Sequence, residues 1–345
     1  MITPAAAAEE TLWLPPEPVR RRWSTWLVHG LKAVVAIGLI GLLVHTIQVA
    51  AIEQAISGAN PLWIAGALLL LPANLYLQVK RWQTAIRAEM PDVTVKQAYT
   101  SFLGGASMGI ITPGRVGEIG RVFLLNPKSR VRLAGLHVLD KLYFMAALAC
   151  FGPALVYLMP GFSEHLHQNL QLPLLIATLI LPLFFVVFSL TPDPLRSLLV
   201  LIRRGDRFKG SLNDLLHALD KVRARDSRVM AGLTVAQFGV ILTQFYLLSS
   251  AFQAVKWVTA AHTYVATLFV KSLLPISLGD LGVSEWAAVS FYQRFGIADT
   301  TAFSASLLIF TINILIPAIA GIFVLQRVKA TNVFGRVAKR IRGKA

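Results

Sequence analysis

The stretch LPLLIATLILPLFFVVFSL, from Leu172 to Leu190, contains no charged residue. Its length matches the run of about 20 apolar residues that a helix needs to cross the hydrocarbon core of a bilayer. A second stretch, LVHGLKAVVAIGLIGLLVHTIQV from Leu27 to Val49, is of similar length and carries little charge. A helix bonds all its backbone groups internally, so it can lie in lipid. The two stretches therefore predict a helical membrane protein.

The composition of the whole chain supports the same prediction. Of its 345 residues, 55% are hydrophobic and 14% are charged, and the mean hydropathy is +0.63. A soluble domain has about 25% charged residues. No stretch of about 100 residues has the mixed composition of a globular domain, so we expect none in this sequence.

The net charge of +16 raises the question of nucleic acid, but the positions of the charges argue against it. Of the 33 basic residues, 26 lie in the N-terminal arm, in 80–96, 126–132 and 191–228, and in the tail from Arg327. The connections 50–60, 159–171 and 253–261 together contain one basic residue, Lys256. This alternation follows the positive-inside rule. We therefore expect both termini in the cytoplasm and no nucleic-acid partner.

The apolar runs and the charges together predict the domain organisation. A cytoplasmic arm, 1–26, precedes a transmembrane domain, 27–326, and a basic cytoplasmic tail, 327–345, follows it. The loop 191–228 contains an amphipathic pattern that is typical of a helix on the cytoplasmic membrane surface. Spans are expected at about 27–49, 61–79, 133–158, 172–190, 229–252 and 301–326.

Two further apolar regions are broken and do not fit ordinary spans. Region 97–125 is interrupted by Thr112-Pro113-Gly114, and region 262–296 is interrupted from Pro275 to Gly282. Each half is shorter than the roughly 20 residues of a span. The first region is flanked by basic segments and the second by charge-poor segments. We therefore predict an all-α polytopic bundle of about six spans, with two re-entrant helical hairpins that enter from opposite sides.

The two breaks contain similar sequences. PGRVGEIG, starting at Pro113, aligns with PISLGDLG, starting at Pro275, and in each a proline, two glycines and an acid share the register. Each motif has a span before its hairpin and a span after it. The pattern predicts two inverted units, about 61–158 and 229–326. In transporters of this kind the substrate site lies near the midplane, where the broken helices meet.

The first break contains the residues best suited to bind an anion. Thr112 and Pro113 can start a helix, whose N-terminus attracts negative charge. Arg115, Glu118 and Arg121 follow at spacings of three, so they can pair along one helix face. Glu118 can neutralise one arginine, and the other guanidinium suits a phosphate. The alternative is an ion-pair cluster that locks the hairpin near the cytoplasmic interface.

Other charged residues in apolar segments have two interpretations each. Asp140-Lys141 is a local ion pair, or it supplies a counter-charge to Arg115 or Arg121. Lys271 pairs with Asp280 or Glu285, or it extends to the membrane interface. Asp280 is also a candidate to bind a proton or a cation. Polar residues within spans, such as Asn74 and Asn313, are expected to join helices by hydrogen bonds.

Signatures of enzymes and metal sites are absent from the sequence. The sequence contains no nucleotide-binding loop and no metal-ligand cluster, so we expect no cofactor, no metal and no enzymatic activity. Trp82 falls near a predicted span end and is interpreted as an interface anchor.

Several of these motifs together resemble a known family. The motifs are Arg81-Trp82, PGRVGE with Arg121, Asp140-Lys141, and LPISLGDLGVSE from Leu274 to Glu285. They resemble the transmembrane region of bacterial lysylphosphatidylglycerol synthases, over roughly residues 30–325. That region defines a wider flippase-like family with members tied to hopanoid biosynthesis. The resemblance implies one motif of Pro113, Gly114, Arg115, Gly117, Glu118 and Arg121, and another of Pro275, Gly279, Gly282 and Glu285.

The chain departs from the family pattern in two ways. Asp280 stands where members usually carry glycine, and Ser284 stands where a basic residue is common. The second motif is therefore the more acidic one, and an anionic headgroup is expected at the first. The sequence also lacks the soluble aminoacyl-transferase domain of the synthases, so we expect no lipid aminoacylation.

These observations favour a lipid translocase in the cytoplasmic (inner) membrane of a bacterium. Its expected partners are membrane lipids, above all an anionic phospholipid, with a homo-oligomer or a lipid-synthesis enzyme as further possibilities. The alternatives are a carrier for a small solute or ion, and a non-catalytic membrane subunit of a lipid-modifying system. The predicted substrate-binding residues are Pro113, Gly114, Arg115, Gly117, Glu118, Arg121, Asp140, Lys141, Lys271, Pro275, Ser277, Gly279, Asp280, Gly282 and Glu285.

Overall fold

The computed structural model describes most of the second of two compact units, 47–345. The predicted span 27–49, the arm 1–26, the tail 327–345, and most of 172–190 and of the loop 191–228 lie outside the described residues. The described residues are 57–160 without 111, 113 and 128, then 172, 173, 176, 180, 183 and 187, and finally 220–273 and 282–326.

Every element in these ranges is a helix, and four helical stretches are long and apolar enough to cross a membrane. They match four of the predicted spans, so the chain is a multi-pass membrane protein; the total of six spans stays a prediction. The four stretches are Pro61–Ile86, formed by α3 (Pro61–Leu69) and α4 (Leu71–Ile86), α6 (Arg130–Tyr157), α11 (Ala224–Ser250), and Asp299–Gln326. The last contains α14 (Asp299–Phe310) and the π-helix η3 (Thr311–Leu315).

Side-chain caps define where several of these helices begin. Asn60 accepts a hydrogen bond from the backbone N–H of Leu62 at the start of α3. Ser129 accepts one from the N–H of Arg132 at the start of α6. Such caps satisfy N–H groups that the helix itself leaves unpaired.

The first described span ends later than predicted. The predicted end at 79 preceded two basic residues, Lys80 and Arg81, but α4 continues to Ile86. Arg81 is buried there because its charge is paired inside the bundle with Asp140. The change from apolar to basic residues therefore does not mark the end of this helix.

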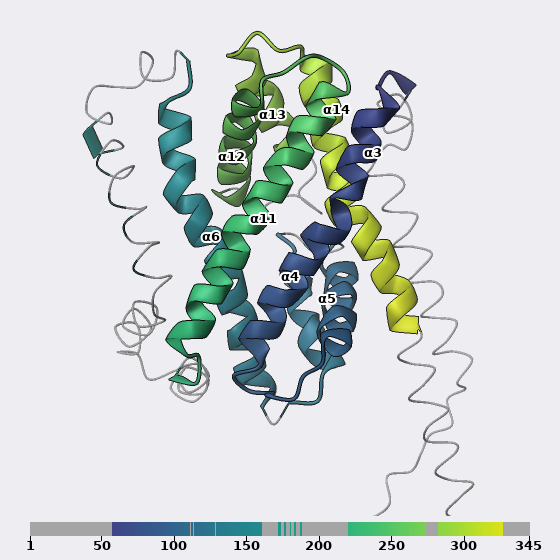
Figure 1. Cartoon of the computed structure of the whole chain (residues 1–345), viewed down its shortest axis with the longest axis vertical. Helices are drawn as coiled ribbons and strands as arrows, with labels where there is room; N and C mark the ends of the chain where they lie inside the picture. Colours follow the sequence, from purple (N-terminus) through teal and green to yellow (C-terminus); the bar gives the residue numbers. More distant parts are fainter. Residues whose placement is uncertain are drawn as a thin grey trace, which may run out of the picture. The chain divides into compact units, whose positions relative to one another are not determined.

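Two pairs of shorter helices lie between the spans. The first pair is α5 (Val95–Gly109) with the 3₁₀-helix η1 (Val116–Leu124), and the second is α12 (Trp257–Leu273) with α13 (Val283–Gln293). In Figure 1, α5 lies in the lower half of the bundle and α12 and α13 lie in the upper half.

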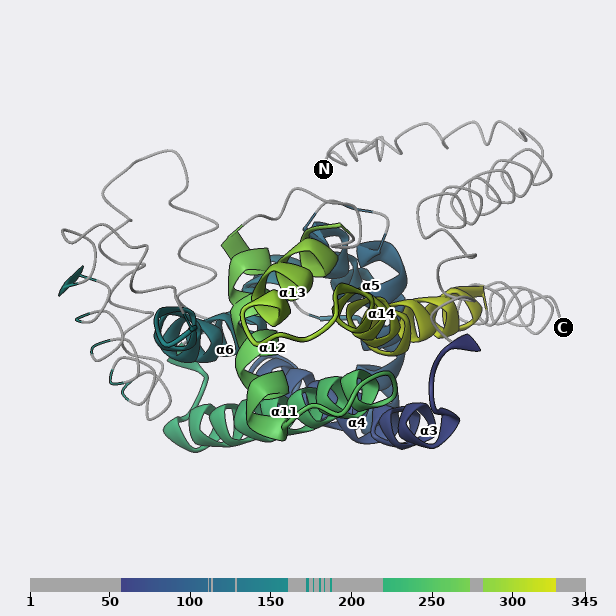
Figure 2. The ribbon, with the colours of Figure 1, turned by 90° about the horizontal axis from the view of Figure 1, so that it is seen from above.

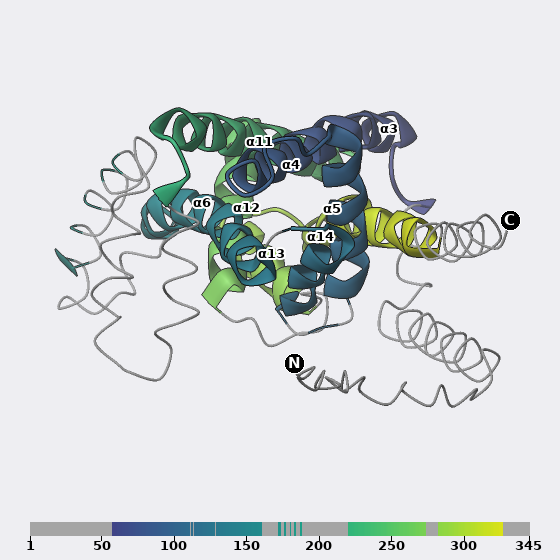
Figure 3. The ribbon, with the colours of Figure 1, turned by 90° about the horizontal axis from the view of Figure 1, so that it is seen from below.

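The end-on views show which spans the short helices contact. Seen from above, α12 and α13 lie between α6 and α14 (Figure 2), and seen from below, α5 lies beside α4 (Figure 3). Each pair thus packs among the spans at its own end of the bundle. The inverted repeat itself stays a prediction.

The hairpin of α5 and η1 closes because small residues face it from both sides. A Cβ atom on Gly117 would lie 2.2 Å from the backbone oxygen of Met108, and one on Gly109 would lie 2.5 Å from Cγ of Glu118. Both distances are far below van der Waals contact. The α5–η1 hairpin therefore requires glycine at these two positions.

Polar side chains join three of the spans. Asn74 on α4 donates to Asn313 Oδ1 on η3 at 2.9 Å, and Asn313 donates to Gln244 Oε1 on α11 at 2.9 Å. Gln244 in turn donates to the backbone oxygen of Ala67 at 3.0 Å, next to the α3–α4 junction. The prediction that Asn74 and Asn313 join helices is confirmed.

Candidate functional site: a buried charge cluster at the first break

The break between α5 and η1 has an unusual backbone. Gly114 and Arg115 both have φ of +57°. In the described part of the chain, no residue other than Arg115 and three glycines has a positive φ. A side chain in this left-handed region costs about 1–2 kcal/mol. Such strain is found at functional sites, where the surrounding structure holds it in place.

The helix after the break differs from the one predicted. It begins at Val116 with Arg115 as its N-cap, and it is a 3₁₀-helix rather than an α-helix that starts at Thr112-Pro113. Thr112 still bonds this turn: its hydroxyl accepts from the N–H of Gly117 at 2.8 Å and donates to the backbone oxygen of Gly109 at 2.9 Å. The positive φ of Gly114 and Arg115 delays the helix start. Pro113 lies outside the described residues.

Glu118 is the centre of the charged groups at the break. Its side chain is 3% exposed and contacts three cations. Arg115 Nη2 lies 2.5 Å from Oε1, while Arg121 Nη2 and Lys141 Nζ lie 2.9 and 2.5 Å from Oε2. Pairing at the spacing of three is confirmed, but Glu118 contacts both arginines rather than one, and Lys141 of α6 joins them.

Asp140 is the second carboxylate of the cluster. Arg81 Nε donates to its Oδ1 at 2.7 Å, and Arg121 Nη1 lies 3.7 Å from its Oδ2. Arg81 also donates to Gln237 Oε1 on α11 at 2.6 Å. Asp140 therefore supplies a counter-charge to Arg121, as one interpretation predicted, and links η1 with α4, α6 and α11. We call these six residues, Arg81, Arg115, Glu118, Arg121, Asp140 and Lys141, the charge cluster.

Aromatic rings enclose the guanidinium of Arg121. Its Cζ lies 5.1 Å from the ring centre of Trp82 and 5.0 Å from that of Phe102, within the range of cation–π attraction. Trp82 is fully buried, and its indole N–H donates to Ser101 Oγ at 2.9 Å. The interpretation of Trp82 as an interface anchor is wrong, because the longer α4 carries it into the bundle.

The charge cluster contains more positive than negative groups. Among the described residues, four cations share two carboxylates, those of Glu118 and Asp140. Arg81 and Arg121 are buried, whereas the side chains of Arg115 and Lys141 are 23% and 44% exposed. The two exposed cations lie on opposite oxygens of the Glu118 carboxylate. The accessible side of the cluster is therefore cationic.

Several buried polar atoms in and beside the cluster make no hydrogen bond. In the described part of the chain these atoms include the donors Arg115 Nε and Arg121 Nη1, the acceptor Glu118 Oε1, and His137 Nδ1. Arg121 Nη1 still lies 3.7 Å from Asp140 Oδ2 in an ion pair. His137 is 6% exposed, one turn before Lys141 on α6, and its ring lies edge-on to that of Trp82. Buried polar atoms usually have partners, and exceptions call for an explanation. A bound anion would supply acceptors for donors of this kind.

At the second break, the described acidic side chain accepts hydrogen bonds from neutral groups instead of lying among several cations. Gly282 has φ of +88° and donates its N–H to Glu285 Oε2 at 2.6 Å, and Ser306 on α14 donates to Oε1 at 3.3 Å. Glu285 is buried and thus joins the start of α13 to α14. Lys271, in the last turn of α12, is close enough to interact electrostatically with Glu285, and neither residue joins the ion pairs of the charge cluster.

The remaining predicted residues of this break are not described. Pro275, Ser277, Gly279 and Asp280 lie outside the described residues, so the pairing of Lys271 with Asp280 and the binding of a proton or cation by Asp280 stay predictions.

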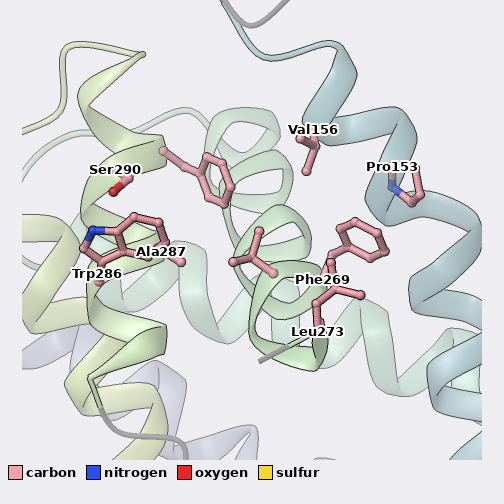
Figure 4. Close-up of a pocket in the computed structure, with 9 residues that line it drawn as sticks. Pro153, Val156, Phe269, Leu273, Trp286, Ala287 and Ser290 are labelled. Atoms are coloured by element: carbon pink, nitrogen blue, oxygen red, sulfur yellow. The ribbon is translucent and has the colours of Figure 1, made fainter. Parts of the chain in front are cut away.

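An apolar cavity of about 410 Å³ lies between α6, α12 and α13 (Figure 4). Phe269 and Leu273 of α12 and Trp286 of α13 line it together with Pro153 and Val156 of α6. Pro153 lies 12 residues after Lys141, about 18 Å along the helix at 1.5 Å per residue. One helix thus carries a cation of the charge cluster and, further along, a wall of the cavity.

Sequence reasoning missed several members of the site. Arg81 was assigned to a cytoplasmic segment, and Phe102, Gln237 and the cavity were not predicted. The only signal for Arg81 was the Arg81-Trp82 pair, which belonged to the family resemblance. Phe102 and Gln237 carry no local signal, because an isolated aromatic residue or amide in an apolar helix is common.

The comparisons with known proteins are consistent with this architecture. The family model described as the lysylphosphatidylglycerol synthase TM region matches residues 30–321. No curated protein and no solved structure matches the chain. The match covers both pairs of short helices, the charge cluster, three of the described spans and all but the last five residues of the fourth. The chain therefore belongs to the family of the lysylphosphatidylglycerol synthase transmembrane region.

Proposed function

We propose that the protein is a lipid translocase that moves a phospholipid or related amphiphile across the membrane without covalent chemistry. The observation that carries this proposal is the charge cluster, which places an excess of cations among helices of the transmembrane domain. Ionisable residues inside a membrane are costly and mark substrate pathways. The most exposed of these cations, Arg115 and Lys141, would bind an anionic headgroup.

The apolar cavity supports an amphiphile rather than a water-soluble substrate. Its lining side chains are apolar except for Ser290, so it suits a hydrocarbon chain better than a polar solute. The offset of about 18 Å along α6 is comparable to the depth of one leaflet, half of a core about 30 Å thick. A lipid with its headgroup at Lys141 could therefore place an acyl chain toward the cavity.

The two short-helix pairs suggest how access could alternate. In inverted-repeat transporters, one repeat rocks against the other around a fixed central site. The pairs α5–η1 and α12–α13 lie at opposite ends of the bundle, as expected for such a transporter (Figure 1). In this proposal the α5–η1 hairpin gives access from the cytoplasmic side and the α12–α13 hairpin gives access from the other side.

The location and partners belong to the same proposal. The positive-inside pattern supports a bacterial cytoplasmic membrane with both termini in the cytoplasm. The membrane lipid is the expected partner, with a second copy or a lipid-synthesis enzyme as a further one. A solute carrier or a non-catalytic subunit would share the helices and the charge cluster but would move no lipid alone.

The test is transbilayer movement of labelled phospholipids in proteoliposomes, with Arg115→Ala beside the parent. Alanine removes the guanidinium but keeps a side chain at the same strained position, so the backbone cost changes little. We expect lipid movement to fall about tenfold or more, as for the loss of a charged hydrogen bond.

The matched control is Arg87→Ala, which removes an exposed arginine at the end of α4. This variant should move lipid at the parental rate. Normal movement by folded Arg115→Ala would overturn the role of Arg115. No movement of any lipid by the folded parent, with saturable uptake of a solute, would favour the carrier instead.

A further inference from the structure

The charge balance of the cluster bears on how many negative charges the bound headgroup carries, not only on their sign. Arg81 and Asp140 form a buried pair, and Arg121 lies between Asp140 and Glu118. Glu118 also contacts Arg115 and Lys141. Among the described residues, two of the four positive charges therefore have no carboxylate of their own. A cation that is partly withdrawn from water and has no counter-charge of its own is costly, so a cluster of this kind favours a ligand that restores the balance.

The two surplus charges are also the accessible ones. Arg115 and Lys141 are the partly exposed cations of the cluster, and they contact different oxygens of one carboxylate. Both surplus charges therefore lie beside the same carboxyl group. Within the described part of the chain, Arg115 Nε makes no hydrogen bond, and Arg121 Nη1 makes none beyond its 3.7 Å ion pair with Asp140. Guanidinium donors of this kind suit a phosphate with several acceptor oxygens.

We propose that this site selects a phosphate group with two negative charges, as in a phosphomonoester, over the single charge of a phosphodiester. The inference rests on the proposed function and names the substrate class of the same site. A phosphomonoester offers three acceptor oxygens and carries nearly two charges at neutral pH, with a second pKa of about 6. Its charge matches the surplus of the cluster.

The first experiment measures binding separately from transport. Radiolabelled glycerol 3-phosphate, a soluble phosphomonoester, is bound to the purified protein in detergent. Phosphatidic acid, phosphatidylglycerol, phosphatidylcholine and inorganic phosphate then compete for it. At pH 7.5 we expect phosphatidic acid to compete at least about tenfold better than phosphatidylglycerol, as for one additional charge pair. Phosphatidylcholine should compete weakly.

Inorganic phosphate separates the two possible sources of this chemistry. A lipid headgroup predicts that phosphatidic acid competes much better than inorganic phosphate, because the acyl chains add apolar contacts. Equal competition by the two, together with uptake of phosphate into proteoliposomes, would overturn the lipid assignment in favour of a phosphate carrier.

Lowering the pH to 5.5 tests the charge on the ligand. Protonation removes one charge from the monoester and none from the diester, so the preference for phosphatidic acid should decrease severalfold. The charged or titratable groups that face the site would affect both lipids together: Arg81 from α4, Arg115, Glu118 and Arg121 from η1, and His137, Asp140 and Lys141 from α6. Thr234 and Gln237 of α11 are neutral.

The variant Lys141→Met tests the charge on the protein. It removes one surplus charge from a side chain that is 44% exposed and keeps the length of the chain. We expect the preference for the monoester to disappear while phosphatidylglycerol still competes. A preference that is absent in the parent, or that survives in Lys141→Met, would overturn the inference.

Movement of the same labelled lipids in phosphatidylcholine vesicles completes the test. Movement without a monoester preference in binding overturns the inference and leaves the translocase intact. Selective binding without any lipid movement overturns the translocase and leaves the phosphomonoester site.

Discussion

Arg115 combines a strained backbone with a partly exposed charge. Its φ of +57° is a conformation that glycine adopts freely and that other residues adopt at a cost. Its guanidinium meets Glu118, which already contacts two other cations. The ion pair with Arg115 is therefore not needed to neutralise Glu118. In the proposed function, the strain and the surplus charge belong to a residue that serves binding rather than stability.

This interpretation predicts the behaviour of Arg115→Gly relative to Arg115→Ala. Both variants lack the guanidinium, so their difference isolates the backbone. We expect Arg115→Gly to be about 1 kcal/mol more stable than Arg115→Ala, with a melting temperature higher by a few degrees in detergent. Both should lose lipid movement equally. Equal melting temperatures would show that this position carries no backbone strain.

At the scale of elements, the α5–η1 hairpin depends on direct contact between its two arms. The Met108 carbonyl faces Gly117, and Glu118 fills the space beside Gly109. These contacts hold Glu118 at the buried end of the hairpin, where α6 brings Lys141 and Asp140. The position of the charge cluster therefore follows from how closely the arms approach.

The variant Gly117→Ala tests this dependence. Its Cβ would lie 2.2 Å from a backbone oxygen, which no rotamer change can relieve. We expect destabilisation of about 1–3 kcal/mol, as for overpacked cores, and a lower melting temperature. The control is Gly239→Ala on α11, where a Cβ would meet no atom within 4 Å and alanine favours the helix. Equal stability of the two variants would contradict the close approach.

At the scale of the whole molecule, the question is whether each short-helix pair returns to its own side of the membrane. α5 begins after the connection that follows α4, and η1 ends shortly before α6 begins. α12 and α13 lie in the same relation to α11 and α14. Two re-entrant hairpins place both flanks of each pair on one side, whereas crossing helices place them on opposite sides.

Single cysteines in a Cys150→Ala background distinguish these arrangements, because Cys150 is the only cysteine and is buried. Asp92→Cys and Asn126→Cys flank the first pair, and Lys256→Cys and Asp299→Cys flank the second, all at exposed positions. With a membrane-impermeant reagent on intact cells, we expect labelling at 256 and 299 only. The sites 92 and 126 should react after the membrane is opened. Opposite accessibility within either pair would exclude a re-entrant hairpin there.

The sequence by itself determined the features that depend on composition and local spacing. Apolar length identified the four described spans, because the bilayer demands about 20 apolar residues from each helix. Proline and glycine marked both breaks, and the spacing of three put Arg115 and Arg121 against Glu118. These are interactions within one turn of chain, so local rules suffice. The inverted repeat remains a prediction from the same kind of reasoning.

Only the tertiary structure decided how the distant charges balance. Arg81 and Asp140 are 59 residues apart, and Arg81 and Gln237 are 156 apart, so no local spacing relates them. Because Asp140 neutralises Arg81 inside the bundle, α4 extends past its basic residues and buries Trp82 against Arg121. The surplus of two positive charges among the described residues, and hence the proposed phosphomonoester, follows from these long-range contacts. A charge can be buried only where the fold provides its partner.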